Sequence, residues 1–349
     1  MNILVTGGAG FIGSNFIKYI LSKYNYKVIN LDLLTYAGSL KNLENLHMYK
    51  NYYFVKGDIC DKKLISSIFE QYKINIVINF AAESHVDRSI EDPTTFLRTN
   101  IKGTQVLLEI AKENWKINKN SRFCTRYIKD TKFVQISTDE VYGSLGKEGY
   151  FTEASPLLPN SPYASSKASA DLLVRAYYTT YGLPINITRC TNNYGPNQFP
   201  EKLIPLTIVN GLNEKQIPLY GNGKQVRDWL HVEDHCTAID KVIHSGAVGE
   251  IYNIGGNNER ENIEVVEMIL SKLDKNKSQI RFVKDRLGHD KRYAINNTKI
   301  TTELGWSPSY KFEEGIEKTI QWYVKNKEWI NDILTGGYKN YYELMYTQR

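Results

Sequence analysis

Three consecutive residues, Thr138, Asp139 and Glu140, combine a hydroxyl with two carboxyl groups directly after the apolar stretch KFVQIS. Two adjacent carboxylates repel each other when both are ionised, and burial of either one costs free energy. The triplet is compatible with a solvated acidic turn that has no chemistry. It is also compatible with acid–base catalysis, in which one carboxyl group stays protonated and the other stays ionised.

A tyrosine and a lysine four residues apart, Tyr163 and Lys167, lie in a stretch that predicts a helix over about 163–181. This spacing puts both side chains on one face of the helix. A nearby ammonium and a positively charged cofactor would favour the tyrosine phenolate, whose ordinary pKa is about 10. A YxxxK pair is common on helix surfaces. Together with Thr138 and a dinucleotide site, it suits hydride transfer from a sugar carbinol.

The N-terminal strand NILVT leads into a turn with Gly7, Gly10 and Gly13, and an apolar helix pattern follows. These glycines permit a tight turn, a close approach of the backbone to a pyrophosphate, and close packing of helix on strand. A second apolar strand ends in Asp32, at the distance expected for an acid that binds the adenosine ribose. An acid here disfavours a 2′-phosphate, so the pattern predicts NAD. The alternative for Asp32 is a strand-end turn residue.

The strand–helix rhythm continues through the first half of the chain and predicts an α/β fold. Further apolar strands are expected at 52–59, 74–84, 132–138 and 183–190, and a long helix is expected over 94–114. Such alternation is typical of a Rossmann-type, doubly wound parallel sheet that binds its ligands at the carboxyl ends of the strands. The triplet at 138–140 lies at one of these ends.

The domain prediction follows from where this rhythm becomes irregular. We expect an NAD-binding Rossmann domain over 1–192, to which 236–256 returns. A smaller, mixed α/β substrate-binding lobe is expected over 193–235 and 257–349.

Composition narrows the class of protein. The net charge of +6 comes from scattered lysines without a long basic run, so nucleic-acid binding is not expected. The four cysteines are far apart, which indicates free thiols in a reducing cytoplasm. No stretch approaches 18 continuous apolar residues, so no membrane span is expected. Cys/His clusters are absent from the sequence, and no metal site is expected.

Five separated motifs carry a family resemblance: AAESHVDRSI, STDEVYG, SPYASSKASAD, NNYGPNQFPEKLIP and RDWLHVEDH. With the glycine-rich turn they resemble the nucleoside-diphosphoglucose 4,6-dehydratases of the extended short-chain dehydrogenase/reductase family. The dTDP-glucose 4,6-dehydratases of rhamnose synthesis are the most similar. The resemblance extends from Met1 to about Trp322.

This resemblance implies a use for both carboxyl groups. Hydride leaves C4 of the glucose for NAD⁺ while Tyr163, assisted by Lys167, takes the O4 proton and Thr138 holds that oxygen. Glu140 then removes the C5 proton, and Asp139, kept protonated, donates a proton to the departing C6 hydroxyl. Return of the hydride to C6 and reprotonation of C5 give a 4-keto-6-deoxy sugar.

The resemblance also implies two sets of binding residues. The cofactor site is expected to contain Gly7, Gly10, Phe11, Ile12, Gly13, Asp32, Leu33, Leu34, Thr35, Asp58, Ile59, Phe80, Ala81, Ala82, Ser84, Thr99, Tyr163 and Lys167. The substrate site is expected to contain Ser84, Thr138, Asn193, Lys202, Leu203, Pro218, Tyr220, Arg227, Asn262, His289, Asp290, Arg292 and Tyr293. Arg227 and Arg292 suit a dianionic diphosphate, although each is also compatible with a surface salt bridge. His85 ranks below Ser84 as a contact to the sugar.

Two expectations concern other chains. The family pairs two helices per subunit in a four-helix bundle, so a homodimer through helices near 101–115 and 163–181 is implied. The basic segment 113–132 is either a solvated insertion or a contact with another chain.

Alternatives to this function remain open. UDP-glucose differs from dTDP-glucose by small groups worth only about 1–3 kcal/mol of discrimination. A 4-epimerase has no need for the Asp–Glu pair, and a decarboxylase needs a uronate pocket that the sequence does not indicate. A non-enzymatic NAD-sensing or scaffold protein would not need the Thr138, Tyr163 and Lys167 set.

Overall fold

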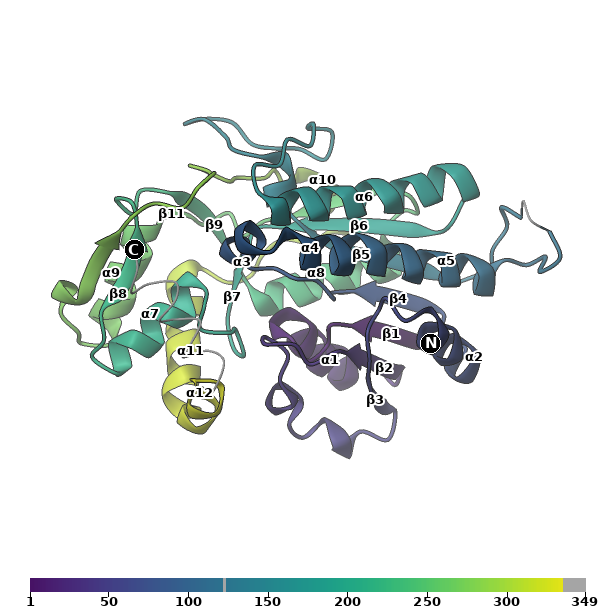
Figure 1. The fold of residues 1–349 in the computed structure, drawn as a ribbon, viewed down its shortest axis with the longest axis horizontal. Coiled ribbons are helices and arrows are strands. Elements are labelled where there is room, and N and C mark those ends of the chain that lie inside the picture. The colour runs from purple at the N-terminus through teal and green to yellow at the C-terminus, as the bar shows by residue number, and fades with distance from the viewer. Residues whose placement is uncertain (122–123, 335–349) are drawn as a thin grey trace.

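The computed structural model describes residues 1–121 and 124–334, and a seven-stranded sheet forms its centre (Figure 1). The strand order is β10-β6-β5-β4-β1-β2-β3, and all neighbouring strands run parallel. The strands are β1 (Asn2–Thr6), β2 (Lys27–Asp32), β3 (Tyr52–Lys56), β4 (Ile76–Asn79), β5 (Lys132–Thr138), β6 (Ile185–Cys190) and β10 (Ile251–Ile254). The order reverses direction next to β1, as in a doubly wound sheet, so the predicted fold class is confirmed.

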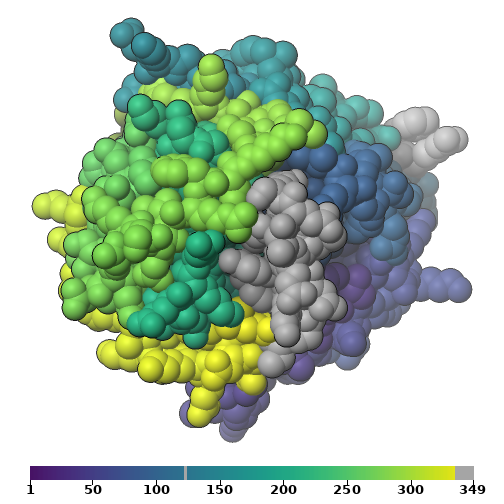
Figure 2. All heavy atoms as spheres, turned by 60° about the vertical axis from the view of Figure 1, so that its left-hand side comes forward, coloured from purple at the N-terminus to yellow at the C-terminus, as the bar shows by residue number. Residues whose placement is uncertain are grey.

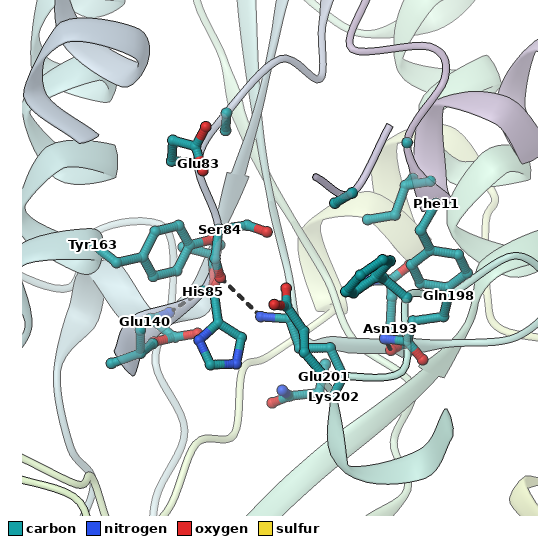
Figure 3. Close-up of a pocket in the computed structure, with 18 of the residues that line it drawn as sticks. Phe11, Glu83, Ser84, His85, Glu140, Tyr163, Asn193, Gln198, Glu201 and Lys202 are labelled. Atoms are coloured by element: carbon teal, nitrogen blue, oxygen red, sulfur yellow. Dashed lines mark hydrogen bonds between the residues drawn. The ribbon is translucent and has the colours of Figure 1, made fainter. Parts of the chain in front are cut away.

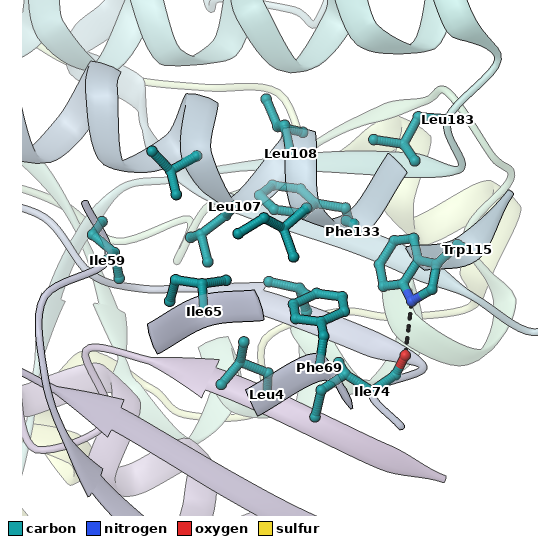
Figure 4. Packing of buried hydrophobic residues seen from close by; sticks show 14 of the residues in the cluster. Leu4, Ile59, Ile65, Phe69, Ile74, Leu107, Leu108, Trp115, Phe133 and Leu183 are labelled. Atoms are coloured by element: carbon teal, nitrogen blue, oxygen red, sulfur yellow. Dashed lines mark hydrogen bonds between the residues drawn. The ribbon is translucent and has the colours of Figure 1, made fainter. Parts of the chain in front are cut away.

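Alternation along the strands gives the sheet two apolar faces. In β1, Ile3 and Val5 pack into one buried cluster and Leu4 packs into the cluster on the opposite face (Figure 4). Helices α1 (Phe11–Lys23) and α8 (Val232–Ser245) supply residues to the first cluster. Helices α2 (Lys62–Tyr72), α5 (Thr104–Trp115) and α6 (Pro162–Tyr181) supply residues to the second. Both faces are therefore buried, as expected of a parallel sheet.

The helix predicted over 94–114 is present but irregular. It consists of α4 (Pro93–Phe96), a π-helical segment (Leu97–Gly103) and α5. The π-helical segment carries Asn100, whose amide donates to the Glu83 carbonyl at 3.0 Å and to the Ser166 hydroxyl at 2.8 Å. Through Asn100, the π-helical segment is therefore hydrogen-bonded both to the loop after β4 and to α6.

A second lobe covers the carboxyl ends of the sheet strands (Figure 1). Its remaining strands are β7 (Asn192–Tyr194), β8 (Ile217–Tyr220), β9 (Val226–His231), β11 (Glu259–Glu261) and β12 (Ile280–Val283). Of the remaining helices, α3 (Val86–Glu91) belongs to the first lobe and α10 (Thr298–Leu304) packs against β10 of the central sheet and against α8. The second lobe contains α7 (Leu203–Leu212), α9 (Asn262–Lys272), α11 (Phe312–Lys325) and α12 (Lys327–Leu334). Figure 2 shows the green and yellow atoms of this lobe beside the blue and purple atoms of the N-terminal half.

The lobe has its own apolar core, to which α11 contributes one face. Phe312, Ile316, Ile320 and Tyr323, spaced along one face of the helix, are all buried there. The predicted domain boundaries stay a prediction, and residues 335–349 of the predicted lobe lie outside the described residues. Among the described helices, none is long and apolar enough to cross a membrane.

Lys132 joins the central strand β5 to the end of α8. Its ammonium donates to the carbonyl oxygens of Val242 and Ile243, both at 3.0 Å, and of Gly246 at 2.9 Å. The Val242 carbonyl also accepts from the Gly246 N–H, so the lysine chiefly satisfies the carbonyl oxygens of Ile243 and Gly246 at this helix end. Burial lowers the pKa of Lys132 to about 8, so at neutral pH the amine is mostly charged.

We therefore expect Lys132→Met to lower the free energy of unfolding by about 1–3 kcal/mol, because the carbonyls of Ile243 and Gly246 lose this donor. Urea unfolding measures this change. Lys129→Met, at an exposed residue of the preceding loop, is the matched control. An unchanged midpoint for Lys132→Met would show that water satisfies these carbonyls equally well.

Candidate active site

A cavity of about 420 Å³ lies at the carboxyl ends of β1, β2, β4, β5 and β6, between the sheet and the second lobe. Its lining combines the glycine-rich turn, the triplet at 138–140, the start of α6 and loops of the second lobe. Figure 3 shows Glu140, Tyr163 and His85 on the side opposite Phe11, Gln198 and Asn193, with Lys202 between them. Ligands of doubly wound sheets bind at this place.

The glycine-rich turn has the shape that a pyrophosphate requires. Gly7 has a φ of +70°, and a Cβ there would lie 2.7 Å from the backbone of Ala81. A Cβ at Gly13 would lie 2.4 Å from the Gly7 carbonyl oxygen, whereas at Gly10 the nearest atom would be 3.3 Å away. Helix α1 begins at Phe11 without a side-chain cap, so its first N–H groups are left for an anion at this helix end.

Asp32 ends β2 and is held by two backbone donors. Its Oδ2 accepts from Ala9 N and its Oδ1 accepts from Leu34 N, both at 2.8 Å. Burial raises the pKa of Asp32, and these two hydrogen bonds oppose the rise. Leu34 does not line the cavity; its contribution is the backbone N–H that orients Asp32. All other residues predicted for the cofactor site line the cavity.

The five predicted catalytic residues all line the cavity. The Thr138 hydroxyl donates to Asp139 Oδ1 at 3.2 Å and accepts from Glu140 N at 3.2 Å. Tyr163 and Lys167 come from the first turns of α6, where the Ser161 side chain caps the helix. The Lys167 ammonium donates to the carbonyl oxygen of Ile136, at 2.6 Å. The fold therefore brings together the two segments whose spacing suggested chemistry.

The two carboxyl groups have different electrostatic surroundings. Burial, followed by the charge of Glu140, raises the pKa of Asp139 well above its usual range. Burial also raises the pKa of Glu140, but Lys202, Arg227 and Arg286 oppose the rise. Only Arg227 and the hydrogen bond with Thr138 oppose the rise in the pKa of Asp139 among its main influences. The site therefore favours a protonated Asp139 beside an ionised Glu140.

Tyr163 is a neutral phenol in these surroundings. Burial raises its pKa well above the ordinary value, and the charge of Glu140 adds to the rise. The hydrogen bond with Thr138 acts in the opposite direction. Burial also lowers the pKa of Lys167. The lysine by itself does not convert the tyrosine to a phenolate here.

The predicted substrate residues line the cavity with one exception, Arg292. The Arg292 guanidinium donates to both carboxylate oxygens of Glu259, at 2.6 and 2.9 Å, outside the cavity lining. Arg286, from the same segment, lines the cavity instead and donates to both oxygens of Asp87, at 3.0 and 2.8 Å. The sequence shows two arginines six residues apart, and only tertiary packing decides which of them faces the cavity.

Sequence reasoning also missed a buried group next to Lys202. Glu201 lines the cavity, accepts from the Tyr36 hydroxyl at 3.0 Å and lies 3.4 Å from Arg88 Nε. The Arg88 guanidinium lies 3.8 Å from the centre of the Tyr36 ring. The signal available in the sequence was an acid adjacent to a predicted site lysine. This contact links the loop after β2 to the second lobe.

Ser84 and His85 both line the cavity. The Ser84 carbonyl oxygen accepts from the Lys202 ammonium at 2.8 Å (Figure 3). His85 is buried, and burial lowers its pKa well below the usual value, so the ring is neutral. In residues 1–121 and 124–334, no group of three or more His, Cys, Asp or Glu side chains is arranged to hold a metal ion.

We expect Asp32→Asn to weaken NAD binding about tenfold and to reduce the preference for NAD over NADP. The substitution removes the charge that binds ribose hydroxyls and repels a 2′-phosphate. Calorimetric titration with both dinucleotides measures the effect. Asp61→Asn is the matched control, because Asp61 also accepts two backbone N–H bonds but caps α2 away from the cavity. Equal NAD affinity in wild type and Asp32→Asn would contradict this role.

Comparison with known proteins identifies the family to which this chain belongs. The model of the family described as GDP-mannose 4,6 dehydratase matches residues 4–319. A dTDP-glucose 4,6-dehydratase of Xanthomonas campestris pv. campestris is 52% identical, over 96% of this chain and 97% of the relative. The dTDP-glucose 4,6-dehydratase of Salmonella typhimurium is 48% identical over the full length of both chains.

Solved structures agree with the sequence relatives. A dTDP-glucose 4,6-dehydratase from Bacillus anthracis in complex with NAD is 54% identical, with a TM-score of 0.86 over 95% of this chain and 99% of that one. One from Streptomyces venezuelae, also with NAD bound, is 46% identical, with a TM-score of 0.88 over 95% of this chain and 100% of that one. A UDP-glucose 4-epimerase from Thermotoga maritima is 28% identical, with a TM-score of 0.83 over 94% of this chain and 100% of that one.

Proposed function

This chain belongs to the dTDP-glucose 4,6-dehydratase family, and we propose that it converts dTDP-glucose to dTDP-4-keto-6-deoxyglucose. The observation that carries this proposal is the pair of a buried Asp139 and a half-buried Glu140 beside Tyr163, in a cavity that also holds the glycine-rich turn. An oxidation at C4 alone needs the tyrosine, the lysine and the hydroxyl. The pair of carboxyl groups adds the acid and the base that elimination of water requires.

NAD is the proposed cofactor. The uncapped start of α1, the absence of a side chain at Gly10 and the carboxylate of Asp32 fit its pyrophosphate and its adenosine ribose. When bound, NAD accepts the hydride from the sugar and later returns it, so that the cofactor ends each cycle unchanged. The residues of this chain bind it, hold the sugar beside it and move the protons.

Tyr163 serves the oxidation by taking the proton of the sugar O4 hydroxyl. Burial keeps its phenol neutral in the structure, and the positive charge of a bound NAD⁺ would lower the pKa of Tyr163 toward the range that a base requires. The Thr138 hydroxyl, at the end of β5, is placed to hold the same oxygen. The Lys167 ammonium is fixed by the Ile136 carbonyl and adds positive charge to this side of the cavity.

Glu140 and Asp139 serve the loss of water. The new C4 ketone acidifies the C5 hydrogen, Glu140 takes this proton, and Asp139 donates one to the C6 hydroxyl as it leaves. The opposing charges of Lys202, Arg227 and Arg286 support the ionised form of Glu140. The pKa of Asp139 is raised more than that of Glu140, which supports the role of Asp139 as the acid.

The second lobe supplies the proposed nucleotide-diphosphate site. Arg227 and Arg286 come from separate segments, line the cavity and suit the two negative charges of a diphosphate. Leu203, Pro218 and Tyr220 line the same cavity and suit a base. The relatives' names favour thymine over uracil, and UDP-glucose remains the alternative substrate.

We further propose a homodimer that pairs α5 and α6 with their copies in a four-helix bundle. Leu172 on α6 is 54% exposed, and Leu97, in the π-helical segment that precedes α5, is 50% exposed, which supports an apolar contact on this side.

We also propose a cytoplasmic location and a place in rhamnose-type deoxysugar synthesis. The four free cysteines suit a cytoplasmic location, because thiols stay reduced there.

Purified protein, assayed without added NAD and then with it, should convert dTDP-glucose to a product lighter by one water, detected by mass spectrometry. UDP-glucose, assayed in parallel, should react more slowly. Glu140→Gln, a near-isosteric change, should bind NAD but form no dehydrated product. Failure of the wild type to convert either sugar, even with NAD supplied, would overturn the proposal.

The charges around Glu140 predict the pH dependence. Glu140 must be ionised to act, so activity is lost as pH falls through its raised pKa. Lys202→Met removes a charge that lowers this pKa. We therefore expect the acid limb of kcat/KM to move to higher pH by about one unit. Lys224→Met, an exposed lysine of the same lobe outside the cavity lining, is the control. An acid limb that stays in place or moves to lower pH would contradict the assignment of Glu140 as the base.

A further inference from the structure

A buried histidine holds the cavity-lining residue Asn193 from behind. Asn193 lies in β7 and lines the cavity, whereas His235 lies in α8, is 0% exposed and does not line the cavity. His235 Nδ1 and Asn193 Oδ1 are 2.8 Å apart. The two segments are 42 residues apart in the chain, so this contact is a product of the tertiary fold.

The chemistry of the contact fixes the tautomer of the ring. An amide oxygen only accepts hydrogen bonds, so Nδ1 must carry the proton and donate it. Burial lowers the pKa of His235 to about 3, and the ring therefore stays neutral with its lone pair on Nε2. Among the described residues, Nε2 has no hydrogen-bond partner. The one N–H of the ring is thus committed to Asn193.

The Thr191 carbonyl oxygen fixes this orientation of the Asn193 amide independently of His235, because it can accept only from the NH₂ group. A flipped amide would place its NH₂ group against the N–H of His235, donor against donor. In the observed orientation the amide nitrogen donates to the Thr191 carbonyl oxygen at 2.9 Å. Gln198 Nε2 also donates to the Asn193 backbone carbonyl at 2.9 Å. The other N–H of the Asn193 amide faces the Cys190 thiol, a weak acceptor that a ligand oxygen can replace.

We propose that His235 is a positioning residue, which together with the Thr191 carbonyl locks the Asn193 amide so that its other N–H donates to an anionic or hydroxyl oxygen of the nucleoside-diphosphate sugar. This inference rests on the proposed function, because it takes the cavity as the sugar-nucleotide site. Arg227, Asn262 and Arg286 line the same cavity and provide the other polar groups for such an oxygen-rich ligand. A pre-oriented donor loses little entropy on binding, and this lowers the cost of substrate recognition.

A second buried histidine at the start of the same helix provides the contrast. His231 caps α8, where its Nδ1 accepts from Glu233 N at 3.4 Å, and its ring stacks on Tyr310 with centroids 4.0 Å apart. His231 is 2% exposed and does not line the cavity. A histidine that only stabilises α8 should behave as His231 does.

The test compares variants of the holoenzyme. His235→Leu should raise the KM for dTDP-glucose, and the Kd for dTDP measured by calorimetry, about tenfold, with a smaller change in kcat and unchanged NAD content. His235→Asn, which places an amide N–H near the position of Nδ1, should restore most of the affinity. His231→Leu should lower the unfolding temperature without changing KM or Kd. In the Asn193→Ala background, His235→Leu should have little further effect.

Several outcomes would overturn the inference. These are a wild-type KM in folded His235→Leu, no rescue by His235→Asn, or additive effects of His235→Leu and Asn193→Ala. If His235→Leu does not fold, ¹⁵N spectra of histidine-labelled wild-type protein decide, because an Nε2–H tautomer at His235 excludes the proposed donor. Wild-type protein that binds dTDP but converts no sugar would contradict the proposed function alone.

Discussion

The closeness of two carboxyl groups at the end of β5, Asp139 buried and Glu140 half-buried, is the physical constraint on which the rest of the site depends. Asp139 is 1% exposed, and both carboxyl groups lie where burial disfavours their charged forms. A site that kept both neutral would have no base, and a site that ionised both would pay for like charges in contact. The structure resolves this by surrounding one group, Glu140, with more positive charge than the other.

That positive charge cannot come from the Rossmann sheet alone. Lys202, Arg227 and Arg286 all belong to segments after β7, which the chain folds back over the carboxyl ends of the strands. The same groups suit the diphosphate of a nucleotide sugar. A single set of cations therefore opposes the rise in the pKa of Glu140 and suits a diphosphate, so in the proposed function the second lobe serves both acid–base chemistry and recognition.

Buried polar contacts hold the segments that line the cavity in fixed positions relative to one another. The Arg286–Asp87 and Glu201–Tyr36 contacts each join a residue of the first hundred to a residue after β7. Asn100, in its π-helical segment, joins the loop after β4 to α6, which carries Tyr163 and Lys167. Each of these contacts satisfies polar groups that burial would otherwise leave unpaired. Because the groups are satisfied only when the segments keep this arrangement, the contacts also specify the shape of the cavity.

The sequence by itself determined the sheet type, the glycine-rich turn, the strand-end triplet and the YxxxK helix, because these depend on local periodicity and on residues close together in the chain. The order of strands places such groups at one edge, so the catalytic lining followed from the fold class. Tertiary structure alone decided that Arg286 rather than Arg292 faces the cavity, that Leu34 contributes only its backbone, and that His235 supports Asn193. The physical reason is that the direction of a side chain in an irregular loop, and its partner across 42 residues or more, depend on packing and charge pairing between distant segments.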